Sequence, residues 1–215
     1  MTEPDSPGPA QLAQPSGETA LLVIDMQNSY FELPGLADKK DAVLACVNEL
    51  IRAAHDAGRP VVLVRTEHQR DGSTWTLNMR ADRQGFAFPG TEQAAFLADL
   101  DTRDHVEIVK TRDSAFHGTG LKAALDRRGV AHVLVCGVST HSCVAQTAIT
   151  AFAENLHAAV AVDSVTSDHA ELSEALLQFL HEEMRQPLLD QAAALALLHE
   201  GWPADDPTQP RSTTS

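Results

Sequence analysis

Short apolar runs recur along this chain and alternate with longer segments in which apolar positions follow helical spacing. The short runs, rich in Val, Leu and Ile, predict buried strands near residues 20–24, 60–65, 105–109, 132–137 and 158–162. The longer segments predict helices near residues 38–57, 91–98, 119–128, 143–154, 169–184 and 189–199. Gly58 and Gly129 each follow a predicted helix and precede a predicted strand, as helix C-caps do.

This alternation predicts an α/β fold, in which a doubly wound parallel sheet has helices on both faces and forms three layers. We expect one domain over residues 18–200, because 215 residues are enough for one substantial core. Residues 1–17 and 201–215 are rich in Pro, Ser, Thr and Gln or Asp, and this composition predicts a disordered lead and a disordered tail.

Chemically active residues follow three of the predicted strands. Asp25 follows the first, Lys110 the third, and Cys143 lies shortly after the fourth, at the start of a predicted helix. The carboxyl ends of parallel strands meet at one edge of a sheet, so we expect these side chains to converge. The carboxylate of Asp25 can accept the thiol proton, and the ammonium of Lys110 can stabilise both the carboxylate and the thiolate. Backbone amides at the start of the helix can hold an oxyanion.

The position of Cys143 also predicts its reactivity. Free amides and the helix dipole at the first turn of a helix favour negative charge. Both effects lower the pKa of a cysteine, so the sequence predicts a thiolate nucleophile.

The motifs around these residues resemble the isochorismatase-like cysteine hydrolases, which include nicotinamidases, N-carbamoylsarcosine amidases and streptothricin hydrolases. The resemblance covers roughly residues 18–185 and rests on three blocks: Leu22-Val23-Ile24-Asp25-Met26-Gln27, Lys110 with Ser114-Ala115-Phe116, and Gly137-Val138-Ser139-Thr140 with Cys143-Val144. It implies that Asp25, Lys110 and Cys143 form the family's catalytic triad. It also implies a cis peptide bond between Val138 and Ser139.

We expect the substrate pocket to form beside this triad. Amides near Val138 and Ser139 are candidates for the oxyanion site. The long irregular segment 66–90 follows the second strand, and long loops in compact domains tend to be functional. Its Trp75 either lines the pocket or pins the loop to the body. Further pocket candidates are Phe116, Glu67 and Asp113, and the two carboxylates would favour an amine-bearing substrate unless they are simply solvated.

The sequence predicts neither a catalytic metal nor a cofactor. Nicotinamidases carry an Asp-x-His metal motif after the second strand, but here Thr66 stands at the Asp position before His68. Hard or borderline metal ions need several convergent protein ligands. Neither GxGxxG after a strand nor GxxxxGK[ST] occurs, so the usual phosphate cradles are missing. We expect His141 to lie beside the site or in an interface.

Charge and cysteine content limit the partners. A net charge of −14 argues against binding nucleic acid or an anionic membrane surface. No apolar run approaches the roughly 20 residues that cross a bilayer, and the first residues do not resemble a secretory signal. Three cysteines without a CxxC pair favour a reduced, cytoplasmic protein. The resemblance implies a homo-oligomer, a dimer or a tetramer.

The function that we predict is metal-independent hydrolysis of a C–N bond in a small molecule, through a thioester on Cys143. The bond would belong to an amide, a ureido group or a lactam, and the acidic balance favours a cationic natural product such as streptothricin. Three alternatives stay open: hydrolysis of the vinyl ether of isochorismate, a non-catalytic binding module on the same fold, and a redox thiol protein.

Overall fold

A six-stranded sheet forms the centre of the molecule, with the strand order β3-β2-β1-β4-β5-β6. The computed structural model describes residues 17–203, so the predicted lead and tail lie almost wholly outside the described residues. All neighbouring strands are parallel, as predicted. The strands are β1 (Glu18–Ile24), β2 (Val61–Thr66), β3 (Val106–Lys110), β4 (Val130–Val138), β5 (His157–Thr166) and β6 (Leu188–Leu189).

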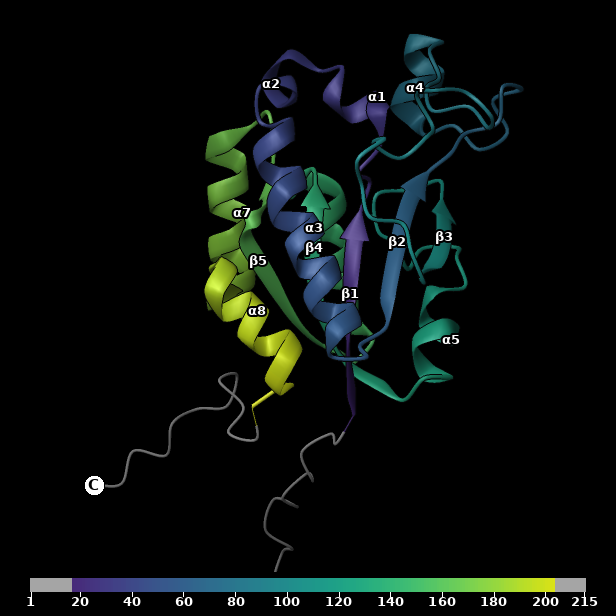
Figure 1. The fold of residues 1–215 in the computed structure, drawn as a ribbon. Coiled ribbons are helices and arrows are strands. Elements are labelled where there is room, and N and C mark those ends of the chain that lie inside the picture. Colours follow the sequence, from purple (N-terminus) through teal and green to yellow (C-terminus); the bar gives the residue numbers. More distant parts are fainter. Residues whose placement is uncertain (1–16, 204–215) are drawn as a thin grey trace, which may run out of the picture.

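Helices cover both faces of this sheet and give the three layers visible in Figure 1. On one face, α3 and α8 pack against Leu21 and Val23 of β1. On the other, α5, α6 and α7 pack against Leu22 and Ile24, because successive side chains of a strand point to opposite faces. The helices are α1 (Asn28–Phe31), α2 (Pro34–Ala37), α3 (Lys40–Asp56), α4 (Leu77–Asp82), α5 (Leu121–Asp126), α6 (Ala145–Ala153), α7 (Ala170–Glu182) and α8 (Gln191–Glu200).

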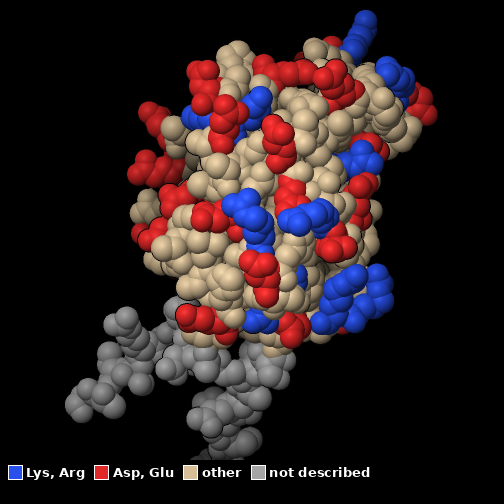
Figure 2. Space-filling view, viewed as in Figure 1, with Lys and Arg blue, Asp and Glu red and all other residues tan. Residues whose placement is uncertain are grey.

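The carboxyl ends of the strands gather at one edge of the sheet, the upper edge in Figure 1, beside α1, α2 and α4. A π-helical turn, η1 (Thr140–Val144), joins β4 to α6 at this edge. Within the described residues, no helix is both long enough and apolar enough to cross a membrane. Figure 2 shows acidic side chains distributed over the visible face, with Lys and Arg in smaller groups between them, so the charge of that face is not gathered in one patch.

One predicted helix is wrong. Residues 91–98 form turns, because their backbone pairs with the chain that leaves β1. Leu97 N–H donates to Met26 O at 2.9 Å, Asn28 N–H donates to Ala95 O at 3.1 Å, and Gln27 and Phe96 form an isolated bridge. Segment 66–90 is also less irregular than predicted, since it contains α4.

Candidate active site

Asp25, Lys110 and Cys143 meet at the carboxyl edge of the sheet. Asp25 directly follows β1, Lys110 ends β3, and Cys143 lies in η1 after β4. Their exposed fractions are 0%, 1% and 4%, so all three side chains are withdrawn from solvent. Lys110 Nζ lies 2.7 Å from Asp25 Oδ2 and 3.3 Å from Cys143 Sγ. The predicted convergence of the three residues is therefore present in the structure.

The backbone turns sharply at Asp25, whose φ is +52°. This left-handed conformation is rare for residues with a side chain, although Asp tolerates it better than most. Gln27 fixes the turn from the other side. Its side-chain amide donates to Thr66 O at 2.9 Å and to Ala94 O at 2.8 Å, and its carbonyl accepts from Thr66 N–H at 2.8 Å. Gln27 thereby ties the end of β1 to the end of β2.

The Lys110 ammonium donates to three neighbours. Besides Asp25 and Cys143, it reaches Thr66 Oγ1 at 2.7 Å. Burial opposes the charge on Lys110, but the adjacent Asp25 carboxylate, and then the Cys143 sulfur, hold the pKa of Lys110 above its ordinary value. Lys110 is therefore a cation in this site, where its partners offset the cost of burying the charge.

Thr66 and Tyr30 complete the group around the triad. The Thr66 hydroxyl donates to Asp25 Oδ1 at 3.1 Å, and the Tyr30 hydroxyl donates to Thr66 Oγ1 at 3.0 Å. Burial, then the charges of Asp25 and Cys143, raises the pKa of Tyr30, so its phenol stays protonated. In the sequence, Thr66 stands out only because it occupies the position of an acidic metal ligand. No sequence pattern singles out Tyr30, which lies in the four-residue helix α1.

The residues near Thr66 do not fit the metal site that nicotinamidases carry there. The Thr66 hydroxyl is engaged by Lys110, whose positive charge would repel a metal ion. His68 is 2% exposed, its Nδ1 lies 3.2 Å from Thr74 O, and its ring packs on Phe86 with a centroid separation of 5.5 Å. Among the residues that the structure describes, the groups of three potential ligands do not include His68.

The state of the Cys143 thiol differs from the prediction. Burial, and then the Asp25 carboxylate, raises the pKa of Cys143 to about 12, and Lys110 opposes this only in part. The predicted lowering of the pKa at a helix start is therefore wrong for the resting enzyme. The turn at Cys143 is π-helical, and both Ser142 N–H and Val144 N–H donate to Ser139 O, at 3.1 and 3.2 Å. The effect of burial and of the carboxylate exceeds that of one short turn.

The peptide bond between Val138 and Ser139 is cis, as the resemblance implies, and both residues are buried. Gly137 precedes it with a φ of +107°, and a Cβ at this position would lie 2.1 Å from Ile24 O. Only glycine fits here, because β4 and β1 approach closely just before the site. The oxyanion candidates Val138 and Ser139 therefore lie between β4 and the η1 turn that carries Cys143.

Of the pocket candidates, Asp113 lies nearest the thiol. Its Oδ1 is 3.9 Å from Cys143 Sγ, and its Oδ2 accepts from Gln146 Nε2 at 2.8 Å. Asp113, Phe116 and Gln146 line a surface hollow. Phe116 is 9% exposed and belongs to the hydrophobic cluster that contains Cys143. Asp113 thus combines solvent exposure with proximity to the sulfur.

The structure does not bring Glu67 or Trp75 to the thiol. The Glu67 carboxylate pairs with Arg65, which also binds Glu107 at 2.8 Å. The Trp75 indole N–H donates to Gln69 O at 2.8 Å, and its ring covers Gly85, where a Cβ would lie 2.6 Å from it. Trp75 thus holds parts of segment 66–90 together, and the carboxylate of Glu67 is paired with a cation.

A three-layer α/β fold with a buried Asp–Lys–Cys group at its strand ends defines a class of cysteine hydrolases. The sequence matches the Isochorismatase domain family over residues 19–192, and the chain belongs to this family. A crystal structure of an isochorismatase family protein from Desulfovibrio vulgaris superimposes with a TM-score of 0.76 at 28% identity, covering 85% of this chain and 98% of that one.

Curated relatives cover much of the same region. A probable inactive nicotinamidase of Arabidopsis thaliana is 35% identical over 143 residues, which are 63% of this chain and 73% of the relative. The ureidoacrylate amidohydrolase RutB of Variovorax paradoxus is 29% identical over 168 residues, 67% of each chain. The streptothricin hydrolase of Streptomyces noursei is 35% identical over 132 residues, which are 61% of this chain and 44% of the relative.

Proposed function

We propose that this protein hydrolyses a C–N bond of a small molecule, without a metal, through a thioester on Cys143. The observation that carries the proposal is the buried Lys110 ammonium, which contacts both a carboxylate and a thiol. Two similar proteins are named as hydrolases: RutB is a ureidoacrylate amidohydrolase, and the other is a streptothricin hydrolase. An amide, ureido or lactam carbonyl is therefore the group that we assign to the substrate.

The proposed reaction begins from a thiol, because a pKa of about 12 leaves little thiolate at neutral pH. Asp25 accepts the thiol proton as Cys143 Sγ attacks the carbonyl carbon. Backbone amides near Val138 and Ser139 stabilise the oxyanion. Protonated Asp25 then gives its proton to the leaving nitrogen, and the C–N bond breaks to leave a thioester.

Deacylation uses the same carboxylate. Asp25 takes a proton from water, the resulting hydroxide attacks the thioester, and the sulfur leaves and regains its proton. The net reaction adds one water to the C–N bond and releases an acid and an amine. Lys110 keeps its proton throughout and stabilises negative charge first on Asp25 and then on the sulfur.

The charge near the thiol favours an amine-bearing substrate. Asp113 is exposed, and its carboxylate lies 3.9 Å from the sulfur, so a cationic group on the substrate would find a partner at the entrance. Isochorismate is a dianion and would meet repulsion at the same place. Among C–N bonds, we therefore propose a cationic amide or lactam, the class to which streptothricin belongs.

We expect Asp113→Asn to raise KM for a cationic amide about twofold to fivefold more than KM for a neutral amide, because an exposed ion pair is worth up to about 1 kcal/mol. Glu67→Gln is the matched control, since Arg65 already neutralises that carboxylate. Steady-state kinetics on a pair of substrates that differ only in charge measure the effect. Equal KM changes for both substrates would remove Asp113 from substrate recognition.

Activity is expected to survive exhaustive chelation, because each proposed step uses only Asp25, Lys110, Cys143 and backbone amides. The measurement is kcat/KM before and after dialysis against EDTA. Loss of activity that Zn²⁺, Mn²⁺ or Fe²⁺ restores would show that a metal takes part in the reaction.

The proposal is tested by a screen of small amides, lactams and ureido compounds, with released amine or ammonia as the readout and Cys143→Ala as the inactive control. Isochorismate belongs in the same screen. One similar protein is named a probable inactive nicotinamidase, which keeps a non-catalytic binding module as the second candidate. Compounds that raise the melting temperature without being hydrolysed would favour that second candidate.

A further inference from the structure

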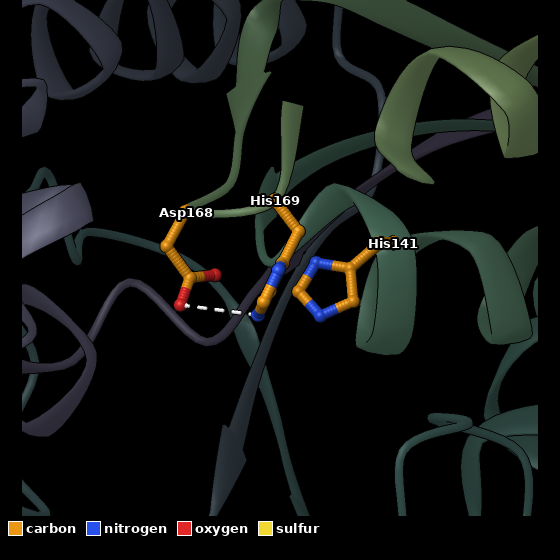
Figure 3. A group of neighbouring side chains, drawn as sticks. All are labelled: His141, Asp168 and His169. Atoms are coloured by element: carbon orange, nitrogen blue, oxygen red, sulfur yellow. Dashed lines mark ion pairs between the residues drawn. The ribbon is translucent and has the colours of Figure 1, made fainter. Parts of the chain in front are cut away.

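Two histidines and an aspartate that the proposed reaction does not use lie together beside the active site. His141 belongs to the η1 turn, two residues before Cys143, whereas Asp168 and His169 lie between β5 and α7. Figure 3 shows the three side chains facing one another. One potential ligand atom from each lies within 4.8 Å of the others, and His169 Nε2 is 3.6 Å from Asp168 Oδ2.

Ser167 orients this group. Its Oγ accepts from His169 N–H at 3.0 Å and lies 3.5 Å from Asp168 Oδ1, to which it donates. His141 Nδ1 bonds to the same oxygen, at 2.5 Å. With Nδ1 of His141 held by Ser167, Nε2 is the ring nitrogen that remains for a ligand.

The segment that carries Asp168 is held by Gly35 of α2 and by Lys39, the residue just before α3. Lys39 Nζ donates to the backbone carbonyl of Ser167 at 2.6 Å, and this hydrogen bond also holds the ammonium of Lys39 at that carbonyl. Gly35 lies against Asp168 so closely that a Cβ there would be 2.6 Å from Asp168 Cβ. His169, whose side chain is 62% exposed, has room to rotate. The group thus combines two fixed members with one that can adjust.

We propose that His141, Asp168 and His169 bind a divalent cation of the zinc class. Two imidazole nitrogens and one carboxylate oxygen suit Zn²⁺, Co²⁺ or Ni²⁺, whereas Mg²⁺ and Ca²⁺ prefer oxygen ligands. Tetrahedral zinc with bonds of about 2.0–2.1 Å spaces its ligands roughly 3.3 Å apart. The separation of 3.6 Å between His169 Nε2 and Asp168 Oδ2 is already close to this value. The ligand atoms of all three residues lie within 4.8 Å of one another, and rotation of the His169 side chain can shorten the longer distances.

Three protein ligands leave at least one coordination position for water or for an anionic or carbonyl group of a small molecule. The site stands apart from the proposed proton transfers, so it does not depend on the proposed function.

The test is zinc binding by protein that carries no affinity tag and has been stripped of metal. Zinc is added back, unbound zinc is removed by gel filtration, and the zinc per chain is measured. The affinity for zinc is measured by competition with a chromophoric chelator. We expect about one zinc per chain in the wild type. His169→Ala should weaken binding at least tenfold, since even the loss of an outer-shell partner costs that much. His199→Ala, at an exposed histidine in the last turn of α8, should leave the affinity unchanged.

Cys143→Ala separates this site from a metal bound by the catalytic thiol. The proposal predicts that Cys143→Ala retains the zinc and that Co²⁺ in the wild type gives no thiolate-to-cobalt charge-transfer band. Zinc that is lost in Cys143→Ala but retained in His169→Ala would overturn it, and so would wild-type protein without stoichiometric zinc.

Discussion

Cys143→Ser is expected to lower kcat by about three orders of magnitude or more while leaving the fold intact. The hydroxyl is a far weaker nucleophile than sulfur, and a carboxylate base is poorly matched to its proton. Because serine is close in size to cysteine, the buried position tolerates it. Turnover of the best substrate from the amide screen measures kcat, and thermal denaturation checks the fold.

Cys46→Ser is the matched control, because Cys46 lies on α3, which covers the opposite face of the sheet from the hydrophobic cluster that contains Cys143, and is also a free thiol. Its turnover should equal that of the wild type. A Cys143→Ser enzyme that keeps more than a tenth of the wild-type kcat would mean that the sulfur is not the nucleophile.

Lys110→Met is expected to slow alkylation of Cys143 by iodoacetamide at least tenfold at a fixed pH. Lys110 is the cation that lowers the thiol pKa, so its removal raises that pKa further and reduces the thiolate present at any lower pH. The same variant leaves the buried Asp25 carboxylate without its ammonium. Loss of one partner of a buried pair costs about 3–5 kcal/mol of unfolding free energy.

Lys122→Met provides the matched control. Lys122 is exposed and pairs with Asp126 one helical turn away at 2.7 Å, so its loss should cost only about 0.5 kcal/mol and leave labelling unchanged. Labelling of Cys143 is followed by peptide mass in a Cys46→Ser background. Asp25→Asn combined with Lys110→Met should recover much of the lost stability. An unchanged labelling profile in Lys110→Met would show that the ammonium does not act on the sulfur.

The fold and the triad could be predicted because local signals were strong. β1 contains an apolar run that Asp25 directly follows, and β3 ends in Lys110, so these two charged residues mark where the chain reaches the edge of the sheet. Asp25 and Lys110 are visible in this way, and the parallel topology brings them together. The helix predicted at 91–98 failed because Gln27, distant in sequence, binds that segment's backbone. Helical spacing carries no information about such a partner.

The electrostatics of the site could not be predicted from the local sequence. The pKa of Cys143 depends on how completely the thiol is buried and on its distance from Asp25, which are properties of the assembled core. The same holds for Thr66, whose hydroxyl joins Lys110 and Asp25, and for His169, which meets His141 only because η1 and the end of β5 are adjacent.

The most direct test of the account is partitioning with hydroxylamine. Several substrates that share one acyl group but differ in the leaving amine are hydrolysed in the presence of hydroxylamine, and the ratio of hydroxamate to acid is measured. The amine leaves when the common thioester on Cys143 forms, so it cannot affect how that thioester divides between water and hydroxylamine. We therefore expect one ratio for all substrates. A ratio that changes with the leaving amine would contradict a shared covalent intermediate and with it the proposed mechanism.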